Sequence, residues 1–314
     1  FLTFVLSISP EGIGKLKEFA KKSQHYVIGE YADFSTLKNA AIELIALKQI
    51  LKDEQKITHD LIAKNELENR IIFAQSNVEN ELQHIYKNAK WTHWKTYLTH
   101  GSPLTALASI IADKIYKKAP VVINELVNRS KPSGSANSAI RKLMNAMFEN
   151  GDKKDLGFDE NSFPPEKGLY LSCLKSKGWH YETPEGYMFP SVWSDEAVND
   201  NPKMYDLWND GFNFIKENST QSHVSMAQLY DRWMLPPFGL TTGLCRIYGL
   251  ALLKSLEGQI AFYDWDSTNQ FIFIPELDEE LVNKIYKHPH EAAVRYFEIS
   301  DIQSHLLENL AQAT

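Results

Sequence analysis

An apolar helix that ends at a glycine and is followed at once by two short strands occurs twice in this 314-residue chain. The first copy spans residues 168–189 and the second spans residues 243–274. The apolar stripes stop at Gly178 and Gly258, and glycine readily takes the left-handed conformation that ends a helix. Because helices followed by a β-hairpin make up a winged-helix module, the sequence predicts two such modules.

The remaining periodicities predict a mainly helical α+β protein. We expect three regions: a strand and long helical region at 1–101, a first winged-helix-like module with a basic turn at 102–192, and a second module with a C-terminal helix at 193–314. The opening apolar run predicts a fully buried strand. Such a strand needs neighbours on both sides and few other strands follow it, so we expect region 1–101 to continue the core of a longer polypeptide.

Two helices are predicted within the first region, at 34–51 and at about 53–90. The predicted core of the shorter helix consists of Ala40, Ile42, Leu44 and Ile45. The longer helix has a narrow apolar stripe in steps of three and four residues, formed by Ile71, Ala74, Val78, Leu82 and Ile85. This stripe suits a helical hairpin or a coiled-coil seam. Packing within its own domain is favoured, because sustained heptads are rare.

Composition limits the function classes. The formal net charge is -7, so the whole chain does not attract nucleic acid or anionic membranes, and a nucleic-acid contact needs a local patch. No apolar run approaches the ~20 residues of a membrane span, and we expect no membrane partner. The two cysteines, Cys173 and Cys245, lie in apolar helical stripes, which predicts a reducing cytosol and neither a disulfide framework nor a zinc site.

A local basic patch is found between residues 117 and 142, where six basic residues accompany one acid, Glu125. Two helices joined by a serine-rich turn can present a helix N-terminus and basic side chains to a phosphate backbone. The candidate DNA-contacting residues are Lys117, Lys118, Arg129, Lys131, Ser138, Arg141, Lys142 and Asn145. The alternative is a solvated helical face that pairs with acidic neighbours, which is the usual role of a charge run.

The second module has the opposite character. Residues 224–274 contain three basic and four acidic residues, and Asp264 and Asp266 lie in the predicted wing, where they would repel phosphate. Aromatic side chains supply apolar area for protein–protein packing. The candidate partner-binding residues are Phe262, Tyr263, Trp265, Phe271 and Phe273.

Catalytic motifs are missing from the sequence. Gly12–Lys15 lies between an apolar run and a helix, as in a phosphate-binding loop, but Ser9 replaces the first glycine and Leu16 replaces the hydroxyl that binds Mg²⁺. His288 and His290 lack neighbouring ligands, so we expect no metal site and no cofactor in this chain. An enzyme would need a convergent polar pocket that no sequence pattern indicates.

Three stretches, 118–147, 156–174 and 236–277, resemble the C-terminal half of the large P-loop ATPases of bacterial phage-defence islands, such as the big ATPase of BREX phage-exclusion systems. The similarity covers about residues 102–286, and this chain has none of the Walker motifs that family members carry upstream. The resemblance implies a role in antiviral defence, with ATP and Mg²⁺ bound by an upstream domain and other defence-system proteins as partners. Residues 1–8 would then be a strand leaving that ATPase core.

Together these features predict a non-catalytic winged-helix region that contacts DNA through the first module or a protein partner. The alternative is a structural protein–protein scaffold that binds no nucleic acid.

Overall fold

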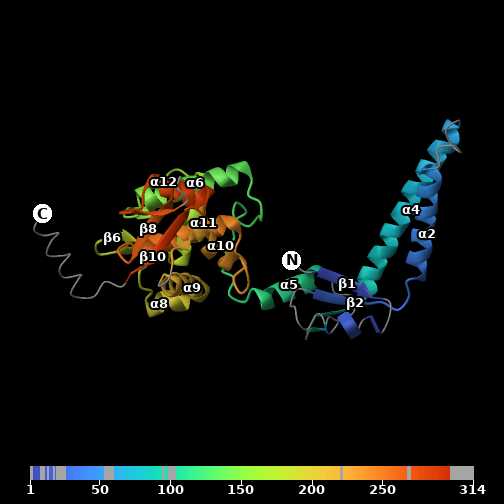
Figure 1. Ribbon diagram of the computed structural model, residues 1–314, viewed down its shortest axis with the longest axis horizontal. Coiled ribbons are helices and arrows are strands. Elements are labelled where there is room, and N and C mark those ends of the chain that lie inside the picture. Colours follow the sequence, from blue (N-terminus) through green and yellow to red (C-terminus); the bar gives the residue numbers. More distant parts are fainter. Residues whose placement is uncertain are drawn as a thin grey trace, which may run out of the picture. The chain divides into compact units, whose positions relative to one another are not determined.

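The protein is a mainly helical α+β protein with small sheets, as the sequence predicts (Figure 1). The computed structural model divides the chain into two compact units, residues 1–115 and 116–314, which are described separately. The residues that the structure describes are 3–7, 11–12, 14–16, 18, 26–52, 60–93, 96–97, 104–219, 222–266 and 270–297.

The first unit contains a four-stranded sheet. Its strands β1 (Thr3–Ser7), β2 (Tyr26–Glu30), β3 (Lys90–His93) and β4 (Thr96–Tyr97) pair in sequence order, and β1 runs parallel to β2. The predicted opening strand is therefore confirmed as a strand. The prediction that its side chains are buried falls outside what the structure describes. Its proposed continuation into a longer polypeptide stays a prediction.

A helical hairpin of α2 (Ser35–Lys52) and α4 (Leu61–Asn88) accompanies this sheet. Asp60 caps α4 by accepting hydrogen bonds from the amides of Ile62 and Ala63. Ala74 and Ile85, from the predicted stripe of the long helix, are buried. The predicted core of α2 is partly wrong, because Ile42 and Ile45 are 55% and 62% exposed and the hairpin buries only one narrow face of each helix. Helix α5 (Leu104–Ile115) ends this unit.

The second unit begins with the elements of the first predicted module. They are α6 (Gly134–Glu149), a short turn η1 (Lys154–Gly157), the consecutive helical segments α7 (Pro165–Leu169), η2 (Tyr170–Leu174) and η3 (Lys175–Lys177), and the hairpin β5 (Tyr181–Thr183) with β6 (Gly186–Met188). Gly178 ends the helical run with a φ of 74°, as its position before the hairpin predicts.

The elements of the second predicted module follow. They are α8 (Asp195–Asp200), α9 (Pro202–Asn218), β7 (Val224–Ser225), α10 (Met226–Met234), α11 (Thr242–Ser255), β8 (Ile260–Trp265), β9 (Phe271–Ile274), α12 (Glu279–Lys287) and β10 (Ala292–Tyr296). The hairpin β8–β9 lies after Gly258, which has a φ of 82°. Strand β10 inserts between β7 and β8, giving the order β7-β10-β8-β9. The winged-helix assignment of both modules stays a prediction.

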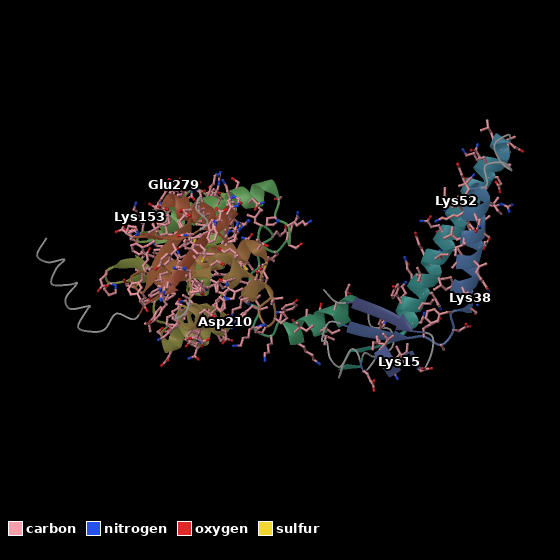
Figure 2. The ribbon with its side chains drawn as sticks, viewed as in Figure 1. Lys15, Lys38, Lys52, Lys153, Asp210 and Glu279 are labelled. Carbon is pink, nitrogen blue, oxygen red and sulfur yellow. The ribbon has the colours of Figure 1, made fainter. Side chains whose placement is uncertain are left out.

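One hydrophobic core runs through both predicted modules, from Val122 to Val294. Helix α11 lies at its centre, and 11 of its 14 residues are buried. The hydroxyl of Tyr248 in α11 donates a hydrogen bond to the carbonyl of Cys173 in η2 at 3.0 Å, and the ring of Tyr248 lies 5.3 Å from that of Trp179. The guanidinium of Arg232 in α10 donates two hydrogen bonds, of 2.7 and 2.8 Å, to the carboxylate of Asp210 in α9. Asp210 is labelled in Figure 2.

Candidate nucleic-acid interface

Helix α6 separates an apolar face from a polar one. Ser133 caps the helix by accepting a hydrogen bond from the amide of Ala136. Its core-facing side chains are fully buried: Ile140, Leu143, Met144 and Met147. Ser138, Arg141 and Lys142 are exposed and Asn145 is partly exposed, at the i, i+3, i+4 and i+7 positions of the opposite face. We call this surface and the exposed Arg129 and Lys131 of the preceding loop the basic face.

Two predicted DNA-contacting lysines are engaged in ion pairs. The ammonium of Lys118 lies 3.0 Å from the carboxylate of Asp206 in α9, and that of Lys142 lies 3.3 Å from Glu166 in α7. The view in Figure 1 shows α6 and α9 on opposite sides of α11. Lys118 is therefore held at α9, while Lys142 belongs to α6, and the six basic residues do not form one patch.

The other basic residues of this stretch remain exposed. Lys117, Arg129, Lys131 and Arg141 form no ion pair within the part of the chain that the structure describes. Such unneutralised side chains favour contact with an anion. The basic face is thus centred on Arg129, Lys131 and Arg141.

Tertiary folding adds Arg246 of α11 to this region. Its guanidinium donates a hydrogen bond to the side-chain carbonyl of Asn137 in α6 at 3.2 Å and lies 4.3 Å from the centre of the Tyr286 ring. The hydroxyl of Tyr286 donates to the backbone carbonyl of Asn137 at 3.1 Å. Sequence reasoning missed Arg246, because it lies 109 positions from Asn137 and no local pattern links the two.

The predicted partner-binding aromatics divide between the two faces of the sheet β7-β10-β8-β9. Phe262 is 5% exposed and lies in the core, so its side chain cannot reach a partner while the sheet is intact. The register pairs Tyr263 with Phe273 and Trp265 with Phe271, which places these four rings on the face opposite to Phe262. We call that side the outer face.

A cluster of rings forms on the outer face. The rings of Tyr263 and Phe273 are 5.9 Å apart, and those of Trp265 and Phe271 are 4.8 Å apart. His223 joins them at 4.1 Å from Tyr263, and its pKa is lowered by burial and by the positive charge of Arg295. Phe273 is the most open of these rings, with 57% of its surface exposed.

The two acids that the sequence places in this hairpin are both engaged. Asp264 alternates with Tyr263 and lies on the inner face, where the ammonium of Lys284 contacts its two oxygens at 2.6 and 2.7 Å. Asp266 accepts a hydrogen bond from the amide of Gln270 at 3.0 Å. The expectation that both acids repel phosphate is therefore wrong for Asp264, which is neutralised and points away from the outer face.

A buried polar network orders the segment between α6 and the first hairpin. His180 lies 2.9 Å from the Tyr170 hydroxyl through Nδ1 and 2.9 Å from the carbonyl of Gly151 through Nε2. Burial lowers the pKa of His180. The Tyr170 hydroxyl also lies 3.2 Å from the carboxylate of Asp155, which is 2.6 Å from the ammonium of Lys175. The φ of Asp155 is 51°. Only 2% of the surface of His180 is exposed. The network therefore stabilises the fold, and its histidine is not accessible to a substrate.

Lys15 of the phosphate-loop candidate forms an ion pair with a neighbouring acid. The ammonium of Lys15, labelled in Figure 2, lies 2.9 Å from the carboxylate of Glu11. Across the described ranges, no three histidine, cysteine or acidic side chains gather in a metal-binding group. Among the helices that the structure describes, none is both long and apolar enough to cross a membrane.

Comparison with known proteins identifies no relative: no protein-family model, curated protein or solved structure matches the chain.

Proposed function

We propose that this protein contacts DNA through the basic face and serves as the non-catalytic, DNA-contacting region of a cytoplasmic bacterial antiviral-defence ATPase. The observation that carries the proposal is the exposure of Arg129, Lys131 and Arg141 without acidic partners among the described residues, in a chain whose net charge is -7. The resemblance of residues 118–147 to phage-defence ATPases supports the defence role, and ATP with Mg²⁺ would belong to an upstream domain.

The basic face is suited to phosphate contacts. Arg and Lys side chains with serine hydroxyls are the usual donors to phosphate oxygens, and α6 places Ser138 beside Arg141 and Lys142 on one exposed surface. Lys142 takes part less readily, because its pair with Glu166 must open before it reaches a phosphate.

Base reading through α11 does not fit the packing. In a DNA-reading module a helix enters the major groove with exposed side chains, whereas α11 is buried along most of its length. The same holds in the first module, where Tyr170, Cys173 and Leu174 of η2 are fully buried. The proposed contact therefore uses the DNA backbone and carries little sequence preference.

Salt-dependent binding to a duplex tests the proposal. The combined substitution Arg129→Glu with Lys131→Glu should weaken binding and flatten the plot of log affinity against log salt by about 0.9 for each lost phosphate contact. Fluorescence anisotropy with a labelled duplex measures both quantities. An unchanged slope contradicts the proposal.

A matched control separates a local contact from net charge. Lys203 is exposed in α9 and has no ion pair within the described residues, so Lys203→Glu changes the net charge by the same amount as Lys131→Glu. Lys131→Glu should weaken duplex binding and Lys203→Glu should not. Equal losses would indicate a non-specific charge effect.

The second candidate is a protein–protein scaffold that binds no nucleic acid. The ring cluster of the outer face favours it, because aromatic side chains are enriched in interface cores. Absence of duplex binding at low salt, together with binding of another defence-system protein that Phe273→Ala abolishes, would support this alternative.

A further inference from the structure

We propose that the outer face of the sheet β7-β10-β8-β9 binds single-stranded nucleic acid, with bases stacked on Tyr263 and Phe273 and a phosphate held by Arg295. This inference extends the proposed DNA contact to a second surface. It rests on separate residues, so either can fail alone.

The rings are arranged as a platform. Phe273 lies on β9 directly across from Tyr263 on β8, and Trp265 with Phe271 continues the row along the same two strands. The interplanar angles of 69° and 76° show that neither pair is closed by face-to-face stacking. His223 packs 4.1 Å from the Tyr263 ring and 5.4 Å from the Phe271 ring, so Phe273, which is 57% exposed, is the ring most accessible to a base. Single-stranded nucleic acid is commonly bound by bases stacked on aromatic side chains of a sheet.

A cation stands next to the platform. Arg295 lies on the outer face of β10, opposite Ala261 and two residues beyond Ala293, which is the strand partner of Tyr263. Its Nε donates a hydrogen bond to the carbonyl of Ser219 at 3.0 Å, and Arg295 forms no ion pair within the described ranges. The guanidinium is thereby positioned while its remaining donors stay available for a phosphate.

A pocket lies between this cation and Tyr263. It measures about 470 Å³ and is lined by Tyr263, Arg295, Phe297, Ser219 and Lys216. This volume lies within the range of pockets that hold small ligands, about 300–1,000 Å³. The ammonium of Lys216 lies 5.2 Å from the centre of the Tyr296 ring.

The charges around the rings favour a negatively charged ligand. The acid nearest in sequence to Tyr263 is Asp264, which lies on the inner face and is neutralised by Lys284. Burial and, after it, the positive charge of Arg295 lower the pKa of His223, which packs against Tyr263. A surface that combines open rings with an unneutralised guanidinium matches a polymer of aromatic bases and phosphates better than a purely apolar protein surface.

Two adjacent residues supply the test and its control. Phe273 and Ile272 follow one another on β9, are 57% and 51% exposed, and point to opposite faces. We expect Phe273→Ala to weaken binding of an oligothymidylate of about 12 nucleotides by about 5- to 150-fold, the usual effect of losing one stacking ring. Ile272→Ala should leave binding unchanged, and Phe273→Tyr should retain it. Fluorescence anisotropy of the full chain gives the affinities, and matching thermal unfolding curves verify that the variants fold.

The salt dependence tests the phosphate contact. Arg295→Gln should reduce the slope of log affinity against log salt by about 0.7, the contribution of one phosphate in a single strand. No binding of the oligothymidylate by the unsubstituted protein, or equal losses in Phe273→Ala and Ile272→Ala, would overturn the inference. Self-association or protein capture that depends on Phe273, without oligonucleotide binding, would likewise overturn it in favour of a protein partner.

The two DNA surfaces can be separated with two ligands. Lys131→Glu should weaken binding of a duplex and spare the oligothymidylate, whereas Phe273→Ala should do the reverse. If Lys131→Glu leaves duplex binding unchanged, the proposed contact at the basic face is refuted. If Phe273→Ala leaves oligothymidylate binding unchanged, the proposed contact at the outer face is refuted.

Discussion

Removal of one hydroxyl at the centre of the second unit should destabilise both predicted modules together. Tyr248 in α11 is fully buried and donates a hydrogen bond to Cys173 in η2 at 3.0 Å. Burial raises the pKa of Tyr248 well above its usual value, so the hydroxyl is protonated and acts as a donor at neutral pH. Tyr248→Phe removes this donor and leaves a buried carbonyl without it.

The expected loss in the free energy of unfolding is about 1–2 kcal/mol. A net hydrogen bond contributes about 0.5–1.5 kcal/mol, and an orphaned buried carbonyl adds to the cost. In a unit of this size, each kcal/mol shifts the melting temperature by about 2–4 °C, which gives a decrease of about 2–8 °C.

Hydrogen exchange of the full chain measures the effect in each module separately. The amides of β5–β6 and of β8–β9 should lose protection by the same free energy, because one core connects them. Tyr181→Phe is the matched control, since Tyr181 is 38% exposed, and it should change stability by less than about 0.5 kcal/mol. A loss of protection confined to one hairpin would refute the single cooperative unit.

Three further outcomes follow from the packing. Gly249→Ala should lower the free energy of unfolding by about 1–3 kcal/mol in urea titrations, because an added Cβ would lie 2.6 Å from the Tyr230 ring; an unchanged midpoint would contradict this. The pKa of His180 is lowered in the folded state, so stability should be full above the unfolded pKa of ~6.5 and decrease below it, and His180→Gln should flatten that decrease. Burial raises the pKa of the Cys173 thiol to about 11 and that of Cys245 to about 12, so neither should react with a thiol reagent at neutral pH until the protein unfolds; rapid labelling of the native protein would contradict the packing.

Local chemistry predicted much of the fold. The glycines Gly178 and Gly258 marked both helix ends because their positive φ angles are a property of the residue type. The capping box that Ser225 and Gln228 form at the start of α10 is equally local, because its two residues are only three positions apart. The buried stripe of α6 is also local, because residues three and four positions apart share one face of a helix.

Strand pairing between residues far apart in the sequence could not be predicted in this way. The place of β10 between β7 and β8 depends on a register between residues about 30 to 70 positions apart, which no local pattern encodes. The left-handed conformation of Asp155 and Leu156 was also unexpected, because non-glycine residues adopt it uncommonly and a leucine has no local hydrogen bond that favours it. Asp155 is held there by Lys175 and by the Tyr170 hydroxyl.

Charge counted along the chain proved less informative than charge placed on the folded surface. Lys118 and Lys142 belong to the same basic stretch, yet each is engaged by an acid from a different helix. Asp264 lies next to Tyr263 in sequence, yet the strand alternation turns it to the inner face and Lys284 neutralises it there. The residues left unpaired after folding are therefore the ones that define a candidate site.

The proposed contacts of these unpaired residues would give the two modules complementary roles. In the first module they are the cations of the basic face, among them Arg129 and Arg141, which suit a phosphate backbone. In the second they are the open rings beside Arg295, which suit unpaired bases. A duplex that is being opened presents both kinds of ligand, whereas an intact duplex presents only the first. The buried position of α11 is consistent with this arrangement, because neither kind of contact requires a helix in the major groove.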